Sequence, residues 1–420
     1  MSLSSAVNAA VTALNAQSSA LAMVSNNLAN ASTTGYKTTT ASFASLVAGS
    51  SAATSAAGGV LATGVSNITG QGLLTSSSVS TNVAIDGNGF FAVTDGVDST
   101  DMYYTRNGEF SVDNDGYLVN NGYYLQGWKT DADGNIEGGA TANALEVIDV
   151  DAISTIAAAT TTVSMEANLP ANAEATDSFQ SSMELFDSLG TVASATITWT
   201  KTADNSWTAT VSNPVLASDS TTEIGTVTSA PITITFNSDG TLASTNPSPP
   251  VLTVGSWTTG AANSSITIDM GTIGTSTGLS QYSSDAETLT VDLETDQDGV
   301  TTGTLTSVSI GEDGTVNAIY DNGMTRSIYK IPVTTFANGD GLTAKSGGIY
   351  AASESSGSGT LRLSGTNGAG TIYGSQIELS TTDTNTEFAK MMAAQQAYSG
   401  AAQIITAAND MFDSLMSAVR

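Results

Sequence analysis

Apolar residues near the start of the chain recur at alternating spacings of four and three. The run extends from Leu3 to Ala31 with one polar member, Gln17, and no glycine or proline interrupts it. This is the a and d spacing of a heptad, and it predicts an amphipathic helix. Such a helix would be roughly 43 Å long at 1.5 Å per residue, and it should end before Gly35. The apolar residues expected on its contact face are Leu3, Val7, Leu14, Leu21, Val24 and Leu28.

The other end of the chain repeats this pattern, with spacings of three and four from Phe388 to Val419. Thr384 lies three residues before Glu387, and this capping-box pattern predicts the start of the helix. Only Gly400 weakens the helix, at a cost of about 1 kcal/mol relative to alanine. The large apolar residues expected on the contact face are Phe388, Met391, Tyr398, Ile405, Phe412 and Met416.

Between these helices, apolar and polar residues alternate one by one in short runs. Examples are Ala195 to Thr200, Ile232 to Phe236 and Ser264 to Asp269. Asp-Gly and Asn-Gly pairs separate many of the runs, among them Asn121-Gly122, and they supply the positive φ that tight hairpins need. The middle of the chain is therefore predicted to be an all-β body of many short strands.

Three segments are rich in small residues, glycine or proline. Residues 44–75 and 353–370 are predicted to be connectors between the β body and the two helices, and residues 246–250 a loop inside the body.

The two helical stripes are only weakly apolar, because alanine, serine, glutamine and asparagine fill many positions. One amphipathic helix cannot bury its stripe alone. We therefore expect the two helices to pair and each pair to pack against neighbouring copies of the chain. The alternative is an intramolecular helical hairpin on a monomer.

Composition limits the partners and the chemistry. The chain has 420 residues and a formal charge of −29, from 39 acidic and 10 basic residues. Such a surface repels nucleic-acid phosphates and anionic membranes. The absence of cysteine and histidine excludes disulfides, thiolate nucleophiles and histidine acid–base catalysis. The first basic residue is Lys37, so we expect no cleaved signal peptide, and no apolar run reaches the ~20 residues of a membrane span.

Two acidic stretches resemble fragments of calcium-binding loops, one starting at Asp113 and one at Asp131. An EF-hand loop needs glycine at its sixth position, but counting from Asp131 the sixth residue is Ile136. Both stretches are therefore predicted to be ordinary β-turns, and no metal site is expected. A secreted adhesin stabilised by calcium is the alternative from another functional class.

An enzyme is not supported. The pairs Asp149/Asp151 and Asp296/Asp298 are of the type that glycosidases use, but no combination of a nucleophile and a base is present. No catalytic residue and no cofactor is predicted. Lys37 and Arg106 are interpreted as structural. The tryptophans expected to anchor the β cores are Trp128, Trp199, Trp207 and Trp257.

Three runs resemble the signatures of bacterial flagellar rod and hook proteins. The first extends from Asn26 to Lys37, the second starts at Val83 and continues to Trp128, and the third extends from Glu387 to Tyr398. The residues that carry the resemblance are Asn26, Asn27, Leu28, Asn30, Gly35, Tyr36, Lys37, Asp86, Gly87, Gly89, Phe90, Phe91, Arg106, Gly108, Gln395 and Tyr398.

Further segments resemble hook proteins rather than rod proteins. The run from Leu185 to Thr191 is similar to the entry of the outer domain of the hook protein, and Gln297-Asp298-Gly299 to its exit. Rod subunits are generally shorter and lack this insert. One departure is the run from Ser380 to Thr384, Ser-Thr-Thr-Asp-Thr, where hook proteins usually have Ser-Asn-Val-Asp-Leu. A distal rod protein or a hook-associated protein is the nearest alternative.

The resemblance implies a multidomain α+β fold. It has paired terminal helices like a coiled coil and two mainly-β domains, the outer one inserted in the inner one. The expected boundaries are 1–32 and 384–420 for the helical core, 33–75 for a connector, 76–145 and 300–383 for the inner β domain, and 146–299 for the outer β domain.

The resemblance also implies a function. The chain would polymerise with copies of itself into a flexible hollow tube that couples the rod to the filament and transmits torque. Implied partners are distal rod subunits, the hook cap, the hook–filament junction proteins and the flagellar export apparatus. The implied location is the extracellular hook, without insertion in a membrane. We further hypothesise that the outer β domains make weak polar contacts that slide when the tube bends.

Overall fold

The computed structural model describes residues 3–51 and 54–418, and they form two compact units. Unit 1 comprises residues 1–152, 307–319 and 325–420, and unit 2 comprises residues 153–306 and 320–324. Terminal helices combined with many β-strands confirm the predicted α+β, multidomain class. The last position of the predicted C-terminal stripe, Val419, lies outside the described residues.

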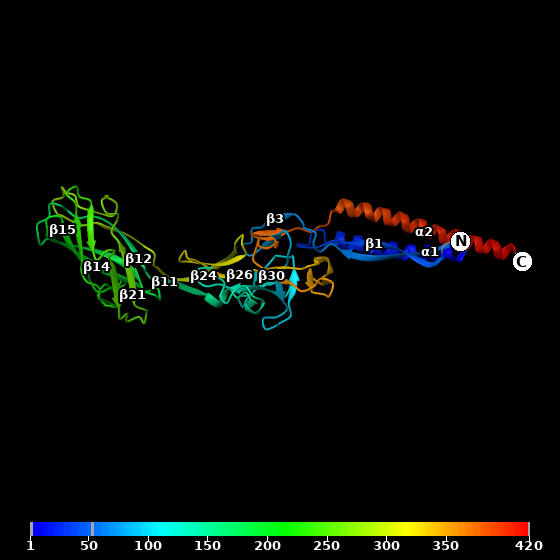
Figure 1. Ribbon diagram of the computed structural model, residues 1–420, viewed down its shortest axis with the longest axis horizontal. Helices are drawn as coiled ribbons and strands as arrows, with labels where there is room; N and C mark the ends of the chain where they lie inside the picture. Colours follow the sequence, from blue (N-terminus) through cyan, green and yellow to red (C-terminus); the bar gives the residue numbers. More distant parts are fainter. Residues whose placement is uncertain (1–2, 52–53, 419–420) are drawn as a thin grey trace. The chain divides into compact units, whose positions relative to one another are not determined.

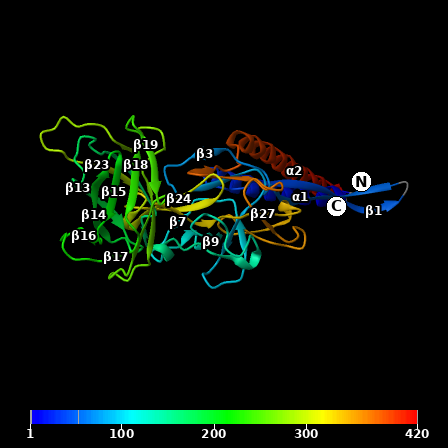
Figure 2. The same ribbon diagram turned by 60° about the vertical axis from the view of Figure 1, so that its left-hand side comes forward.

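Two long helices of unit 1 lie side by side and antiparallel, α1 (Leu3–Ala29) and α2 (Thr384–Ala418) (Figures 1 and 2). Both were predicted from the heptad spacing of apolar residues. This spacing places the apolar side chains on one face of the helix, which packs against a neighbouring element. The end of α1 meets the start of α2, because the side chain of Asn27 hydrogen-bonds that of Glu387. The predicted pairing of the terminal helices is confirmed.

The predicted cap of α2 is off by one residue. The side chain of Asp383, not that of Thr384, accepts hydrogen bonds from the backbone N–H groups of Asn385 and Thr386, at 2.9 and 3.3 Å. Aspartate is among the best N-cap residues, since its carboxylate satisfies N–H groups that have no partner within the helix. Glu387 does not complete a capping box, because its carboxylate is bonded by Asn27 and Lys390.

The segment predicted to be a loose connector is instead a long β-hairpin of β1 (Thr39–Ser51) and β2 (Thr54–Ser66) that packs on α1. Its small residues let the ribbon approach the helix closely. At Gly59, with φ of +113°, a Cβ atom would lie 2.2 Å from the hydroxyl oxygen of Thr12. Glycine, which suggested a flexible linker, therefore allows a close contact between the hairpin and α1.

The β part of unit 1 is made of short strands, and Asn121-Gly122 forms the predicted tight turn between β8 and β9, with positive φ at both residues. Two strand pairs, β4 with β31 (Thr371–Gly374) and β3 with β32 (Gln376–Glu378), place the segment before α2 against the segment after the hairpin. The other strands of this part up to β10 are β3 (Leu74–Ser76), β4 (Val83–Asp86), β5 (Phe91–Thr94), β6 (Tyr103–Thr105), β7 (Ser111–Val112), β8 (Leu118–Asn120), β9 (Tyr123–Lys129) and β10 (Leu145–Val147).

The chain returns to unit 1 through β24 (Val300–Ile310), and a second set of short strands then leads to α2. Among the described residues of this return, β26 pairs with β9 and β29 pairs with β6. The strands are β25 (Thr315–Tyr320), β26 (Thr325–Lys330), β27 (Val333–Thr335), β28 (Thr343–Lys345), β29 (Ile349–Ala351), β30 (Thr360–Arg362), β31 (Thr371–Gly374) and β32 (Gln376–Glu378). The described residues also include three short 3-10 helices, Ala142–Ala144, Asp151–Ile153 and Gly339–Gly341.

Unit 2 is a sandwich of two six-stranded sheets around one apolar core. One sheet has the order β17-β20-β21-β12-β22 with β23 also on β12, and the other has the order β13-β14-β15-β18-β19 with β16 also on β14. Burial alternates along β12 and β14, as the one-by-one pattern predicted. The strands of the sandwich are β12 (Thr162–Asn168), β13 (Ser178–Phe186), β14 (Val192–Ala203), β15 (Ser206–Val211), β16 (Val215–Leu216), β17 (Thr226–Val227), β18 (Ile232–Phe236), β19 (Leu242–Asn246), β20 (Val251–Gly255), β21 (Ser264–Asp269), β22 (Leu279–Ser280) and β23 (Leu293–Gln297). Outside the sandwich, β11 (Thr155–Ala158) pairs with β24.

The tryptophans lie in the cores, as predicted. Trp199, Trp207 and Trp257 are buried in unit 2, and Trp128 is buried in unit 1. The indole N–H of Trp128 donates to the backbone oxygen of Thr141 at 2.8 Å, so the ring is buried without an unsatisfied donor. In the described part of the chain, no helix has the length and the apolar character needed to cross a membrane.

Candidate assembly surface and its anchoring charge cluster

The contact between α1 and α2 is lined by alanine. On α2 the buried positions recur every seven residues, at Glu387, Ala394, Ala401 and Ala408. On α1 the buried small residues are Ala10, Ala16 and Ala20. Small side chains let two helices approach closely, but each buries little apolar area, so this contact contributes little stability per residue.

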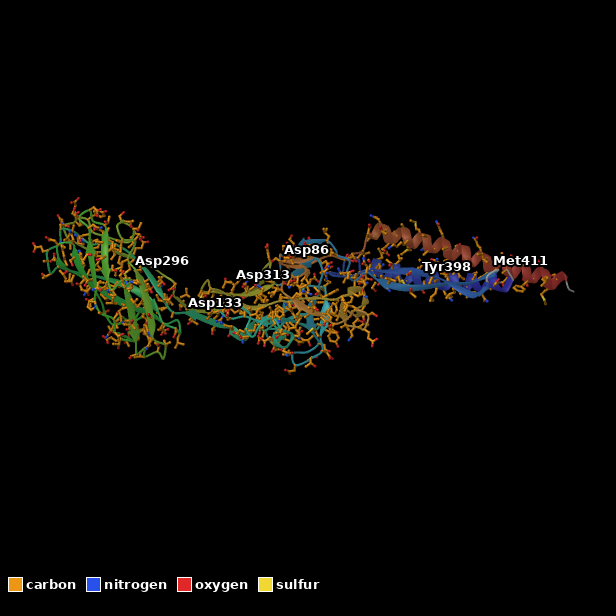
Figure 3. The ribbon with its side chains drawn as sticks, in the orientation of Figure 1. Asp86, Asp133, Asp296, Asp313, Tyr398 and Met411 are labelled. Carbon is orange, nitrogen blue, oxygen red and sulfur yellow. The ribbon has the colours of Figure 1, made fainter. Side chains whose placement is uncertain are left out.

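The large apolar side chains of α2 are mostly not buried in this contact. Those at least 40 % exposed on α2 are Phe388, Met392, Tyr398, Ile404, Met411, Phe412, Leu415 and Met416, with exposed fractions from 43 to 71 %. Figure 3 shows Tyr398 and Met411 along the helix, with Met411 toward its end. So many exposed large apolar side chains on one helix are unusual on a monomer and indicate an interaction site.

The structure places the predicted contact residues in three groups. The buried one is Val24, and the exposed ones are Phe388, Tyr398, Phe412 and Met416. The half-buried ones are Val7, Leu14, Leu21, Leu28, Met391 and Ile405. The side chain of Leu3 lies outside the described side chains. Sequence reasoning missed the alanine contact, although its seven-residue spacing was present, because bulky residues dominate an apolar pattern.

Close to the end of α1 and the start of α2, a buried charge cluster joins segments that are far apart in the sequence. The Glu378 carboxylate contacts the Lys37 ammonium at 2.5 Å and the Arg106 guanidinium at 3.4 Å. All three side chains are almost completely buried. Lys37 also donates to the backbone oxygen of Gly70, and Glu378 accepts from the backbone N–H of Gly72, each at 2.6 Å. The cluster thus ties β32 to the ends of the β1–β2 hairpin.

Arg106 connects the cluster to the inner strands. Its guanidinium donates to the backbone oxygens of Ile85 at 3.3 Å and Gly87 at 2.6 Å, and it lies 5.3 Å from the centre of the Phe90 ring. Burial lowers the pKa of Lys37 and that of Arg106, and the nearby Glu378 carboxylate opposes this by favouring both charged forms. Removing one partner of such a buried pair costs about 3–5 kcal/mol, because a charge is left uncompensated.

Asn27 forms a second link, between both helices and the hairpin. Its side-chain nitrogen donates to the backbone oxygen of Thr39 at 2.8 Å and to Glu387 at 3.1 Å. Its side-chain oxygen accepts from the backbone N–H of Thr39 at 3.0 Å and from the hydroxyl of Tyr36 at 3.1 Å. This buried amide therefore fixes where α1 ends and where α2 begins.

The turn after α1 requires glycine. Gly35 has φ of +69°, and a Cβ atom there would lie 2.7 Å from the backbone nitrogen of Asn107. Its N–H donates to the backbone oxygen of Glu378 at 2.8 Å. The first and second signature runs therefore touch at this turn, next to the charge cluster.

The remaining signature residues lie in unit 1 around the same junction or on the helix surface. Asn30 donates to the backbone oxygen of Asn26, and Asp86 accepts from Gln71. The rings of Phe90 and Phe91 pack edge-on against Phe336 and Phe110. Those that face solvent on α2 are Gln395 and Tyr398; those beside the cluster in the strands and turns are Gly87, Gly89 and Gly108.

Sequence reasoning identified Lys37 and Arg106 as structural but missed Glu378. The three residues are separated by up to 341 positions, so no local spacing reveals them. The available signal was chemical: Lys37 and Arg106 are two of only 10 basic residues and stand in signature runs, and a buried cation requires a buried acid.

The acidic stretches once compared with calcium loops form turns. The side chain of Asp113 accepts from the backbone N–H groups of Asp115 and Tyr117, and Asp131 does the same for Asp133 and Asn135. Within residues 3–51 and 54–418, no group of three or more acidic side chains is arranged to hold a metal ion.

Models of known families match four stretches of the chain. Residues 8–37 match the family described as flagella basal body rod protein, and residues 84–174 match the flagellar hook protein FlgE/F/G D1 domain. Residues 155–300 match the flagellar basal body protein FlaE D2 domain, and residues 375–418 match the flagellar basal body rod FlgEFG protein C-terminal region.

Full-length relatives are also similar. The flagellar hook protein FlgE of Brucella abortus is 31 % identical over 431 residues, which cover 100 % of both chains. FlgE of Escherichia coli K12 is 31 % identical over 432 residues, covering 98 % of this chain and 99 % of that one. Among solved structures, FlgE2 of Helicobacter pylori has a TM-score of 0.45 and 14 % identity, covering 71 % of this chain and 99 % of that one.

Proposed function

The chain belongs to the flagellar hook protein family and is a structural subunit of the hook, and we propose how it polymerises: neighbouring copies cover the exposed apolar faces of α1 and α2. The observation that carries this proposal is the difference in burial between two kinds of side chain on α2. Alanine makes the contact within the chain, while the large apolar side chains remain exposed.

The energetics support this arrangement. Burying one leucine- or phenylalanine-sized side chain contributes about 1.5–3 kcal/mol. The formal charge of −29 opposes association, so apolar burial must supply the favourable free energy. The helix α1 has no charged residue, and α2 has four within its 35 residues. Self-repulsion is therefore weakest at α1.

The proposed assembly core is residues 1–32 and 384–420, lining the channel of the tube. Residues 33–75 link it to an inner β domain of 76–145 and 300–383, into which the outer β domain of 146–299 is inserted. Ser and Thr occupy many outward positions of the unit 2 strands, as at Thr162 and Ser164 on β12. Short hydroxyl side chains exchange hydrogen-bond partners easily, which suits outer contacts that slide when the tube bends.

We further propose that the subunit is exported by the flagellar export apparatus without a cleaved signal peptide. Its assembly partners would be the distal rod subunits, the hook cap and the hook–filament junction proteins. No catalysis is proposed.

The test is polymerisation of Ile404→Asp. Ile404 is 50 % exposed, so the change should leave the fold of the monomer intact but place an unpaired charge in the contact between copies. The critical concentration for polymerisation should rise at least about tenfold, which corresponds to about 1.4 kcal/mol. Salted-out protein is measured by light scattering and by electron microscopy.

The matched control is Gln403→Asp, at an exposed neighbouring position. It adds the same charge without removing an apolar side chain. Unimpaired tubes from Ile404→Asp would overturn the proposal. Wild-type protein that forms straight stubs rather than curved tubes would favour a rod-like role.

A further inference from the structure

A groove of about 460 Å³ lies between α1, β1 and the first half of α2. Its walls are mostly apolar and include Met23 and Val24 from α1, Phe43 from β1, and Ala393 and Ala397 from α2. Phe43 is 48 % exposed. A cavity of 150 Å³ holds one benzene, so the groove has room for about three ring-sized groups.

The other end of α2 carries side chains of the matching kind. Asn27 lies opposite Glu387, and α1 begins about 24 residues before Asn27. Counting the same number along α2 from Glu387 reaches Met411. The last two turns of α2 therefore extend past α1, and their large apolar side chains are 44 to 71 % exposed: Met411, Phe412, Leu415 and Met416.

The exposed charges of the two regions differ in sign. Lys390, at the rim of the groove, pairs with the buried Glu387 at 2.7 Å, and its own side chain is 44 % exposed. Asp410 and Asp413 lie at the far end, where α2 has no basic residue in its last turn. A helix C-terminus carries about half a negative charge, which acidic side chains reinforce. Among its described residues, the end of α2 is therefore an apolar tip that carries negative charge.

The tip cannot reach the groove of its own chain. Ala397 and Phe412 stand about 22 Å apart along a continuous helix at 1.5 Å per residue. A second copy of the chain offers the same tip to every groove. We therefore infer that the Met411–Met416 tip of one copy docks in the groove between α1, β1 and α2 of the next copy.

This contact is head-to-tail, because each copy uses two different surfaces. Such heterologous contacts produce rings or open helical polymers, whereas contacts between identical surfaces stop at dimers. The inference rests on the proposed function and extends it by naming the two surfaces of one contact. The second copy covers both the apolar groove and the apolar tip, and it brings Lys390 near the two aspartates.

The test uses the absence of cysteine in the chain. In the double variant Ala397→Cys/Leu415→Cys, the two thiols of one chain are about 27 Å apart along α2, too far for a disulfide within the chain. Oxidation of its polymers should give a ladder of covalent multimers on a denaturing, non-reducing gel. Each single variant should give dimers at most.

The matched control is Gln403→Cys/Leu415→Cys, which keeps the tip thiol and moves the other to an exposed position outside the groove. Its cross-linked fraction should be at least about tenfold lower, since disulfides need Cα atoms within about 7 Å. Tubes that give no ladder, or an equal ladder with the control pair, would overturn the docking and leave the proposed function standing. A wild-type chain that forms no polymer would overturn both.

Two complementary variants provide a second test. Ala397→Trp fills the groove but leaves the tip, and Leu415→Asp disables the tip but leaves the groove. Each alone should remain monomeric where the wild type polymerises, and a 1:1 mixture should form a dimer in sedimentation. A mixture that remains monomeric, or polymers from either variant alone, would contradict the docking.

Discussion

The carboxylate of Glu378 is completely buried between two cations that come from distant parts of the chain. Lys37 follows α1, Arg106 lies after β6, and Glu378 ends β32, only a few residues before α2. Unlike the charges of a surface ion pair, these buried charges cannot be solvated by water if a partner is lost. It fixes the segments that carry both helices to the same set of strands.

The Glu378→Gln variant should lower the stability of unit 1 by about 3–5 kcal/mol, because two buried cations lose their counter-ion. Calorimetry should show a lower transition temperature for unit 1 and an unchanged transition for unit 2. The control is Asp313→Asn, which breaks the Lys330–Asp313 pair at 2.6 Å. That carboxylate is 60 % exposed, so its loss should cost at most about 1 kcal/mol. Equal effects of the two changes would contradict this account.

Asp187 is the corresponding buried acid of unit 2. Burial raises the pKa of its carboxyl, but hydrogen bonds from Thr259, Thr191 and Leu189 outweigh that effect and hold the pKa below its usual value. The folded state therefore binds this proton less readily than the unfolded state. The resulting stability is present above the unfolded pKa of about 3.9 and is lost as the pH falls through the folded value.

We expect Asp187→Asn to flatten the acid limb of unit 2 stability. Below about pH 4 the slope of unfolding free energy against pH should fall by up to about 1.4 kcal/mol per pH unit, because one linked proton is removed. Urea unfolding followed by tryptophan fluorescence measures it. The control is Asp204→Asn in the exposed turn between β14 and β15. A slope unchanged by Asp187→Asn would refute the assignment.

Among the elements, the helices were predictable and the hairpin was not. Heptad spacing locates α1 and α2 because it depends on neighbours in the sequence. The β1–β2 hairpin is hidden by its composition, since the glycine that suggests a linker is the one that admits Thr12. The sequence also did not reveal whether alanine or the bulky residues form the contact between α1 and α2, because both recur with the period of a helix.

Two adjacent residues of α2 should respond in opposite directions. Gly400 is exposed and a Cβ atom there meets nothing within 4 Å, so Gly400→Ala should stabilise the helix by about 1 kcal/mol. Ala401 is buried in the contact with α1, so Ala401→Leu should destabilise the pair by about 1–3 kcal/mol through overpacking. Thermal melting of the helical signal in circular dichroism measures both. The same sign for both changes would contradict the alanine contact.

At the scale of the whole molecule, alternation along the chain predicted β structure but not the pairing of strands. In unit 2, β12 pairs parallel with β21 and β22, which lie about 100 residues later, and antiparallel with β23. Such pairings depend on the completed sandwich rather than on local pattern. The assembly surface shows the same limit: sequence indicates that the helices are amphipathic, and the structure shows which apolar residues the chain itself does not cover.

The central claim is that other copies cover the exposed apolar side chains of α2. Oxidation of methionine by peroxide tests it directly, since reactivity follows exposure. Met392, Met411 and Met416 are 55 to 71 % exposed, whereas the buried reference residues of unit 2, Met165, Met183 and Met270, are at most 3 % exposed. Mass spectrometry of monomer and polymer should show the three α2 methionines oxidised rapidly in the monomer and at least about tenfold more slowly in the polymer. Equal rates in both states would contradict the account.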